Sequence, residues 1–215
     1  MKLKDVFEQL SYGELAQLSL GGEQGVIDES NYQRVMASIN LGLTDLHSRF
    51  LLKEGRTTVT LQTGQISYVL TQEDLLRIER VYDGEGTELL LNAGGNTQAA
   101  EYRGCTTPNH KTLVVPPAVT GPVTVVYRAN HPLLVKELGY YDANSVEVEL
   151  PQSHLNALLL FVASRIMNPI GLNQQFHDGN NYWAKYEAAC QLLLDQNFRV
   201  DQSEENLRLV RNGWV

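Results

Sequence analysis

The sequence of 215 residues predicts an α+β fold, in which helices from the two ends of the chain form one helical bundle and an antiparallel β module is inserted between them. Apolar residues recur at every third or fourth position near both ends, whereas they alternate with polar residues through the middle. Such segregated runs of helix and strand are typical of α+β proteins. We therefore expect a discontinuous helical bundle of residues 1–54 and 151–198, a β module of residues 55–150 and a C-terminal tail of residues 199–215.

The first predicted helix runs from Lys4 to Leu18, and Tyr12-Gly13 is a candidate break within it. The segment that follows contains three glycines, which disfavour both helix and strand: Gly21, Gly22 and Gly25. It lacks the Gly-Lys-Ser/Thr sequence of a phosphate-binding loop, so we interpret it as a hinge or a surface loop.

The longest predicted helix spans Ser30 to Leu52. Ser30 and Gln33 have the spacing of a capping box, and Gly55 follows the helix as a breaker. One face of the helix is continuously apolar: Tyr32, Val35, Met36, Ile39, Leu43, Leu46 and Phe50. This face needs a partner, and the apolar helix predicted from Gln152 to Asn168 supplies one if the two helices pack antiparallel.

The middle of the chain predicts about five to seven strands. Two hairpins are expected, one turning at Thr63-Gly64-Gln65 between strands around Val59 and Tyr68, and one turning at Asp83-Gly84-Glu85-Gly86. The remaining predicted strands are separated by Pro116-Pro117, by Gly121-Pro122 and by a polar segment: Leu113 to Val115, Val123 to Tyr127 and Val146 to Leu150.

The last predicted helix runs from Tyr182 to Asn197, with a cap at Asp178 to Asn181. The tail after it is polar and carries Trp214 one residue from its end. Two interpretations of Trp214 stay open, since the indole either folds back on the last helix or anchors the tail in a partner.

The charge of the chain argues against a general nucleic-acid binder, because the chain has 17 basic and 25 acidic residues and a net charge of −8. An acidic wall is nevertheless compatible with DNA that slides past it. Cys105 and Cys190 form no disulfide framework, and we expect Cys190 to be buried. With no signal peptide or membrane span in the sequence, we expect a reducing compartment and no membrane.

The sequence contains no signature of catalysis. The five histidines lack metal-ligand spacing, no serine lies in Gly-x-Ser-x-Gly, and Cys105 has no base partner in sequence. We assign no catalytic, cofactor-binding or metal-binding residue and expect no enzyme and no cofactor. An alternative is a carbohydrate- or protein-binding β module on a helical stalk, with tyrosines as its contact residues: Tyr68, Tyr82, Tyr102 and Tyr127.

Five segments of the chain carry a resemblance to a known family: SLGGE (Ser19 to Glu23), the long helix NYQRVMASINLGLTDLHSRFLL (Asn31 to Leu52), IERVYD (Ile78 to Asp83), GPVTVVYRANHP (Gly121 to Pro132) and NYWAKYEAACQLL (Asn181 to Leu193). Over nearly its whole length the sequence resembles the head-to-tail adaptor, or connector, proteins of tailed double-stranded DNA bacteriophages.

The resemblance implies a structural virion protein rather than an enzyme. Such a subunit is made in the host cytoplasm and joins a ring of other copies, typically twelve, in the neck of the virion. The implied partners are the portal protein and the tail or nozzle proteins, with DNA passing through the ring without specific binding. We expect heterologous contacts between copies, and partner contacts at Arg208, Arg211 and Trp214 in the tail.

Overall fold

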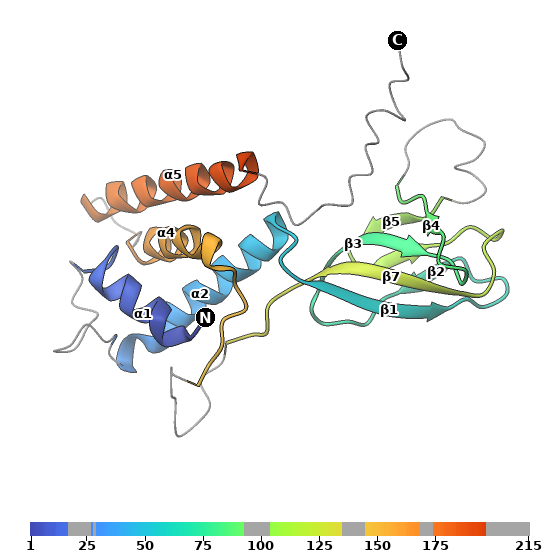
Figure 1. Cartoon of the computed structure of the whole chain (residues 1–215), viewed down its shortest axis with the longest axis horizontal. Helices are drawn as coiled ribbons and strands as arrows, with labels where there is room; N and C mark the ends of the chain where they lie inside the picture. The colour runs from blue at the N-terminus through green and yellow to red at the C-terminus, as the bar shows by residue number, and fades with distance from the viewer. Residues whose placement is uncertain (17–26, 28, 93–103, 135–144, 168–173, 197–215) are drawn as a thin grey trace, which may run out of the picture. The chain divides into compact units, whose positions relative to one another are not determined.

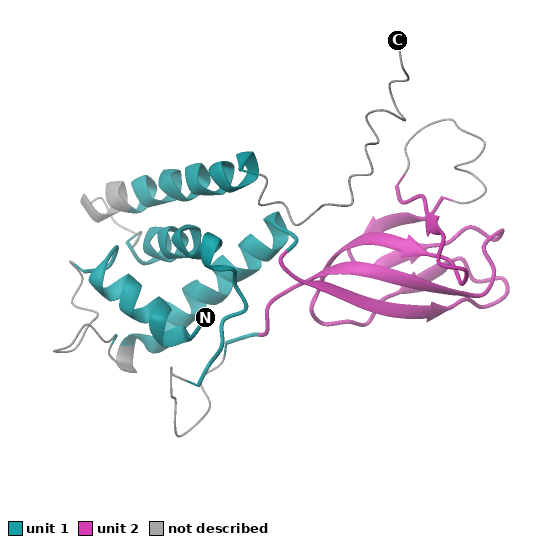
Figure 2. Ribbon diagram, viewed as in Figure 1, with its two compact units in different colours: residues 1–51, 133–215 teal, residues 52–132 magenta. Residues whose placement is uncertain are grey.

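The computed structural model describes residues 1–16, 27, 29–92, 104–134, 145–167 and 174–196. The chain divides into two compact units (Figures 1 and 2). The helical unit is Met1–Leu51 with Leu133–Val215, and the β unit is Leu52–Pro132. The predicted α+β class with an inserted antiparallel β module is confirmed. The domain boundaries stay a prediction, because a compact unit in a structure does not show that the unit folds alone.

The helical unit contains four described α-helices: α1 (Leu3–Tyr12), α2 (Glu29–Arg49), α4 (Leu155–Ile166), which follows the 3₁₀ turn η1 (Gln152–His154), and α5 (Gln174–Asp195). Helix α1 ends at the expected glycine, where the Gly13 amide donates to the Gln9 carbonyl at 2.9 Å. A Cβ on Gly13 would lie 2.7 Å from the Gln9 oxygen, so the glycine is required for this ending.

Helix α4 lies at the centre of the helical unit, in contact with α1, α2 and α5, and is almost entirely buried. Its packing on α2 is antiparallel, as predicted. At one end Arg34 donates to the Ile166 carbonyl at 3.0 Å, and at the other the Phe50 and His154 rings meet edge to face. Gly42 permits the close approach of the two helices, since a Cβ there would lie 2.8 Å from a methyl group of Leu158.

Helix α5 begins eight residues before its predicted start, so the predicted cap at 178–181 is wrong and these residues lie inside the helix. A glycine within a helix costs about 1 kcal/mol relative to alanine. Gly179 is buried, and tertiary packing therefore outweighs its low helix propensity.

The predicted strand Val146 to Leu150 is also wrong. This segment belongs to the helical unit, where it lies as extended chain against the beginning of α1. The Leu3 amide donates to the Val146 carbonyl at 3.0 Å, and the Val148 amide donates to the Met1 carbonyl at 2.8 Å. A single bridge of this kind buries alternate residues as a sheet does, which explains why the sequence pattern resembles a strand.

The β unit consists of two antiparallel sheets with a shared core. The first has the order β1-β7-β3-β4, from β1 (Glu54–Thr60), β7 (Pro122–Ala129), β3 (Leu75–Tyr82) and β4 (Glu88–Leu89). The second has the order β2-β6-β5, from β2 (Ser67–Val69), β6 (Thr112–Val114) and β5 (Thr106–Asn109).

The first predicted hairpin is wrong, because β1 and β2 belong to different sheets and β1 pairs instead with β7. The expected turn does form at Gly64, which has a φ of +83°, but it carries the chain from one sheet to the other. The second hairpin is confirmed, with Val81 opposite Leu89. Strand β5 was not predicted, since Thr-Thr-Pro-Asn has no apolar alternation.

Candidate functional site

The described residues contain no group of three or more potential metal ligands among His, Cys, Asp and Glu. The two thiols are free and buried. Burial raises the pKa of the Cys105 thiol to about 11, and burial also raises the pKa of Cys190. Neither thiol is therefore a reactive thiolate at neutral pH. The candidate functional features of the described residues are therefore surfaces that could bind a partner.

The first surface is the tip of the β unit, formed by the loops 61–66, 83–87 and 115–121 (Figure 1). Strands β1 and β3 lead into this end of the sheet and β7 leads away from it. Each loop contains one glycine with a φ of +83° or +84°: Gly64, Gly86 and Gly121. These glycines permit three tight turns to converge at one end of the unit.

A pocket of about 420 Å³ lies at the tip, between the 61–66 and 115–121 loops. Its apolar walls include Leu61, Ile66 and Val119. Tyr68 borders the pocket and fixes one loop, because its hydroxyl accepts from the Gln62 amide at 2.9 Å and donates to the Gln65 carbonyl at 2.7 Å. Tyr68 thus holds the 61–66 side of the pocket in place.

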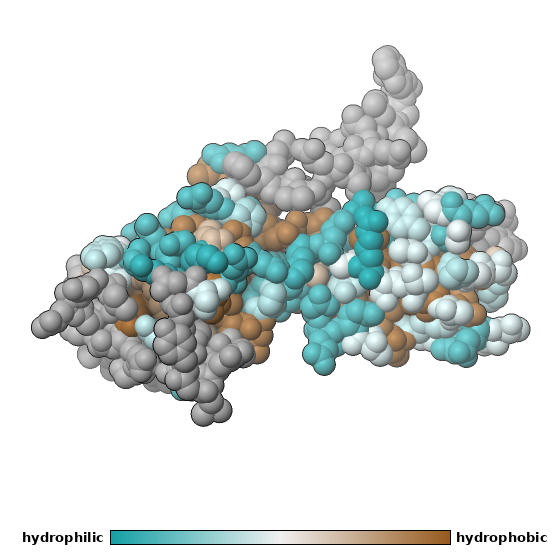
Figure 3. Space-filling view, turned by 60° about the horizontal axis from the view of Figure 1, so that its bottom comes forward, coloured by the Kyte–Doolittle hydropathy of each residue, from teal (hydrophilic) through white to brown (hydrophobic). Residues whose placement is uncertain are grey.

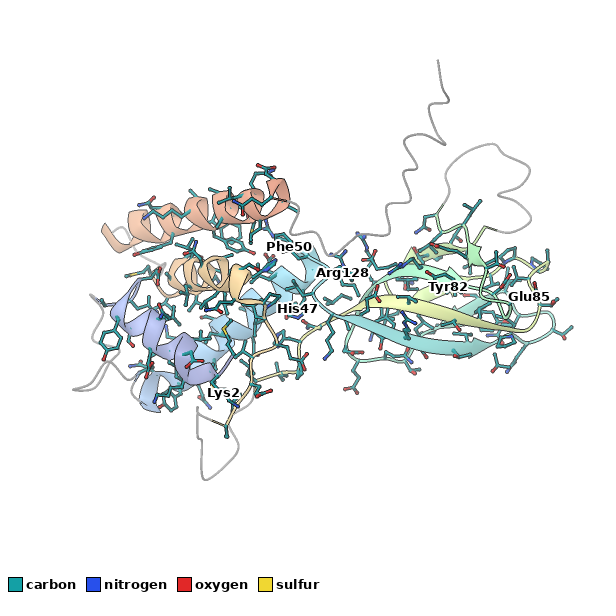
Figure 4. The ribbon with its side chains drawn as sticks, in the orientation of Figure 1. Lys2, His47, Phe50, Tyr82, Glu85 and Arg128 are labelled. Atoms are coloured by element: carbon teal, nitrogen blue, oxygen red, sulfur yellow. The ribbon has the colours of Figure 1, made fainter. Side chains whose placement is uncertain are left out.

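A second hollow of about 230 Å³ adjoins the first and shares Val119 and Thr120 with it. Its other wall is the β3–β4 turn, with Asp83 and Glu85 (Figure 4 labels Glu85). One carboxylate oxygen of Asp83 accepts from the amides of Glu85 and Thr87, at 2.9 and 2.8 Å. The tip therefore combines an apolar pocket with an acidic hollow.

The second surface is the outer face of the four-stranded sheet, where two glutamates each lie between two arginines. Glu54 pairs with Arg80 and, at 3.8 Å, with Arg56. Glu79 pairs with Arg77 at 2.9 Å and with Arg128 at 2.7 Å, and Arg128 is labelled in Figure 4. With Glu88 of β4, which lies opposite Tyr82, this face carries four arginines and three glutamates, a local excess of one positive charge in a chain of net charge −8.

A charged cluster also joins α2 to α5 within the helical unit. Arg49 donates two hydrogen bonds of 2.8 Å to Glu187 and one of 2.7 Å to Asp45, and Tyr186 donates to Asp45. The hydrogen bond from Arg49 lowers the pKa of Glu187. Because every charge in this cluster has a partner, its role is to hold two helices together.

The predicted partner-binding residues Arg208, Arg211 and Trp214 lie outside the described residues. Of the four tyrosines in the alternative prediction, Tyr102 also lies outside them, Tyr68 and Tyr127 are only 7% and 5% exposed, and Tyr82 is half-buried. The two buried tyrosines belong to the core of the β unit.

Several large apolar side chains are exposed without having been singled out from the sequence: Tyr12, Leu41, Trp183 and Leu192 in the helical unit, and Ile66, Val69 and Leu90 in the β unit. Figure 3 shows hydrophobic surface on each unit. Turn signals for the tip were present in the sequence at Gly64, Gly86 and Gly121, but only the sheet order shows that they converge. No helix within the described ranges is long and apolar enough to cross a bilayer.

Comparison with protein families gives a match over most of the chain. The model of the SU10 adaptor protein family matches residues 11–209. A search of curated proteins found no match.

Proposed function

The chain belongs to the SU10 adaptor protein family, and from this premise we propose that it is a head-to-tail adaptor, which forms a ring between the portal and the tail of a phage and leaves a channel for DNA. The observation that carries the proposal is the extent of the family match. Residues 11–209 include α2, α4, α5 and the whole β unit, so the match covers both units rather than one shared module.

The exposed apolar side chains and the tip pocket of the described residues are compatible with a protein that binds other proteins. The net charge of −8 is compatible with a channel wall that does not retain DNA. A structural role in the virion, without catalysis, accounts for these features together.

In the proposed ring each copy meets the next through two different surfaces, and twelve copies is the number that the family resemblance implies. The proposed contact with the portal is the C-terminal tail, through Arg208, Arg211 and Trp214. A tryptophan with two arginines close to it in sequence has the composition of an interface anchor, because tryptophan and arginine are enriched among the residues that dominate binding.

Mass photometry of the full chain, alone and with the portal of its own phage, tests the proposal. We expect the portal to gain about a dozen copies of the chain, the number of a closed ring. A Trp214→Ala, Arg208→Ala, Arg211→Ala variant is expected to lose this association and stay folded. Arg165→Ala is the matched control, since Arg165 is an exposed arginine of α4, far from the tail in sequence. A folded wild-type chain that never binds the portal would contradict the proposal.

The pocket at the tip favours one other candidate function, a β module that binds a carbohydrate or a protein through that pocket. A glycan array and a Val119→Asp variant separate this candidate from the adaptor. Saturable glycan binding that the variant abolishes would support it, whereas the adaptor requires no glycan.

A further inference from the structure

Among the strands that the structure describes, the two sheets of the β unit have four outer strands, and only one of these presents a long regular edge. β4 has two residues and β2 has three, while β5 has four residues with a register shift and contains Pro108. β1 has seven residues, contains no proline and keeps an unbroken register with β7 from Glu54 to Thr60. Short strands, bulges and prolines are the usual ways to block an edge, and β1 has none of them.

One backbone hydrogen bond shows which β1 residues point their N–H and C=O groups toward β7 and which point them away. The Ala129 amide donates to the Lys53 carbonyl at 2.9 Å, so Lys53 and every second residue after it face β7. The residues between them direct their backbone N–H and C=O groups away from β7: Glu54, Arg56, Thr58 and Thr60. No strand within the described ranges lies on that side, and β1 is the outermost strand of its sheet in Figure 1.

The same four residues also have exposed side chains, because the burial of β1 alternates along its length. Of the two charged residues among them, Arg56 is the more exposed. Its side chain is 73% exposed, and its contact with Glu54 is 3.8 Å long, whereas Arg80 lies closer to the same carboxylate. An incoming strand that placed a carboxylate opposite Arg56 would therefore gain a cross-strand charge pair.

We propose that the open edge of β1 accepts an extended strand from a second copy of this chain, which adds to the four-stranded sheet beside Glu54 to Thr60. We infer from charge complementarity that the added strand comes from a second copy of this chain. The outer face of this sheet has four arginines against three glutamates, and Arg56 is the most exposed of these arginines. A copy with 25 acidic and 17 basic residues supplies carboxylates that match it.

This inference rests on the proposed function and deepens it. A closed ring needs two different surfaces on each copy, an acceptor and a donor. Each copy has one acceptor edge of this length in the described part of the β unit, so each can receive one strand and the contact propagates from copy to copy.

Residue-resolved hydrogen exchange of the full chain tests the inference, with the amides read by NMR after exchange is quenched. The chain is compared as the monomer and in the assembled state, formed alone or on the portal and first verified by mass photometry. The outward amides of Arg56, Thr58 and Thr60 are expected to exchange at least ~10-fold more slowly in the assembly. The inward amides of Thr57 and Val59 are protected in both states and serve as the internal reference.

A pair of proline variants tests the same edge. Thr58→Pro removes an outward N–H without removing a bond to β7, and an edge strand tolerates proline at such a position. We expect it to fold and to lose assembly. Ser67→Pro is the matched control, because Ser67 lies on the outer side of β2 and its amide likewise faces away from its neighbour β6. We expect Ser67→Pro to assemble as the wild type does.

The outcomes separate the inference from the function on which it rests. Rings that form while the outward amides of β1 exchange as fast as in the monomer would overturn the strand addition and leave the adaptor proposal intact. Normal assembly of Thr58→Pro would likewise overturn the strand addition and leave the adaptor proposal intact. A folded chain that forms no assembly, alone or on the portal, would overturn both.

Discussion

At the scale of single residues, two glycines show how closely this fold is packed. Gly42 lets α2 and α4 approach each other, and Gly55 lets the Tyr127 ring lie on the backbone of β1. The hydroxyl of Tyr127 then donates to Asp74 at 3.1 Å, which fixes the ring in that position. At both positions a Cβ atom would occupy the space that a neighbouring side chain fills.

Gly55→Ala is expected to destabilise the β unit by about 1–3 kcal/mol, because the new Cβ would lie 2.2 Å from a ring carbon of Tyr127. Gly84→Ala is the control, since its Cβ would meet Pro122 at an ordinary 3.5 Å and its free energy of unfolding should change by less than about 0.5 kcal/mol. Urea unfolding followed by circular dichroism measures both. Equal stability of the two variants would contradict the role assigned to Gly55.

His154 makes the stability of the helical unit depend on pH. It is buried against Phe50, and burial lowers its pKa. The unfolded chain, whose imidazole titrates near ~6.5, therefore binds the proton more tightly than the folded chain does. The stabilisation is complete above that pH and is lost as the pH falls toward the lower pKa of the folded state.

We expect the free energy of unfolding to fall between about pH 7.5 and 5.5, and to fall less in His154→Leu, which keeps an apolar contact and binds no proton. Asn156→Leu is the control, because Asn156 is an exposed residue of α4 without a titratable group, and its replacement should leave the pH dependence as in the wild type. An unchanged slope in His154→Leu would show that another group is responsible.

At the scale of elements, the charged cluster of Arg49, Asp45, Tyr186 and Glu187 joins α2 to α5. Arg49→Ala is expected to cost roughly 1 kcal/mol, the upper range for partly exposed pairs, because it removes three hydrogen bonds at once. Lys4→Ala removes an exposed pair with Glu8 and should cost no more than about 0.5 kcal/mol. Thermal unfolding compares them, and a loss no larger than that of Lys4→Ala would contradict the role of the cluster.

The helices could be predicted from the sequence because their packing follows local periodicity. The apolar stripe of α2 and the wide apolar face of α4 predicted that the two helices pack antiparallel. The start of α5 was missed because Asp-Gly-Asn-Asn is a strong capping pattern, whereas the helix in fact continues through these residues.

Strand partners were harder to predict than strands. The pairing of β1 with β7 joins residues far apart in the sequence, and the adjacent turn at Gly64 favours the wrong partner. The tip and the open edge of β1 both depend on this sheet order, so neither candidate surface could be derived from the sequence. The tail residues that the sequence did single out lie outside the described residues.

At the scale of the whole molecule, the chain enters and leaves the β unit at adjacent points, because Lys53 and Ala129 share a backbone hydrogen bond of 2.9 Å. Replacing residues 53–131 with a short Gly-Ser linker is therefore expected to leave the helical unit folded. Far-ultraviolet circular dichroism should show its helices and a cooperative thermal transition. A chain without a cooperative transition would show that the helical unit depends on the β unit.

The central position of α4 also has a consequence for synthesis on the ribosome. The β unit is continuous in sequence and emerges complete, whereas α1 and α2 emerge long before the helix that covers them. At about 5–20 residues per second, the stretch from Arg49 to Leu155 takes roughly 5–20 s to translate. During that interval the apolar face of α2 lacks its partner helix, and the nascent chain at this stage presents a binding site for chaperones.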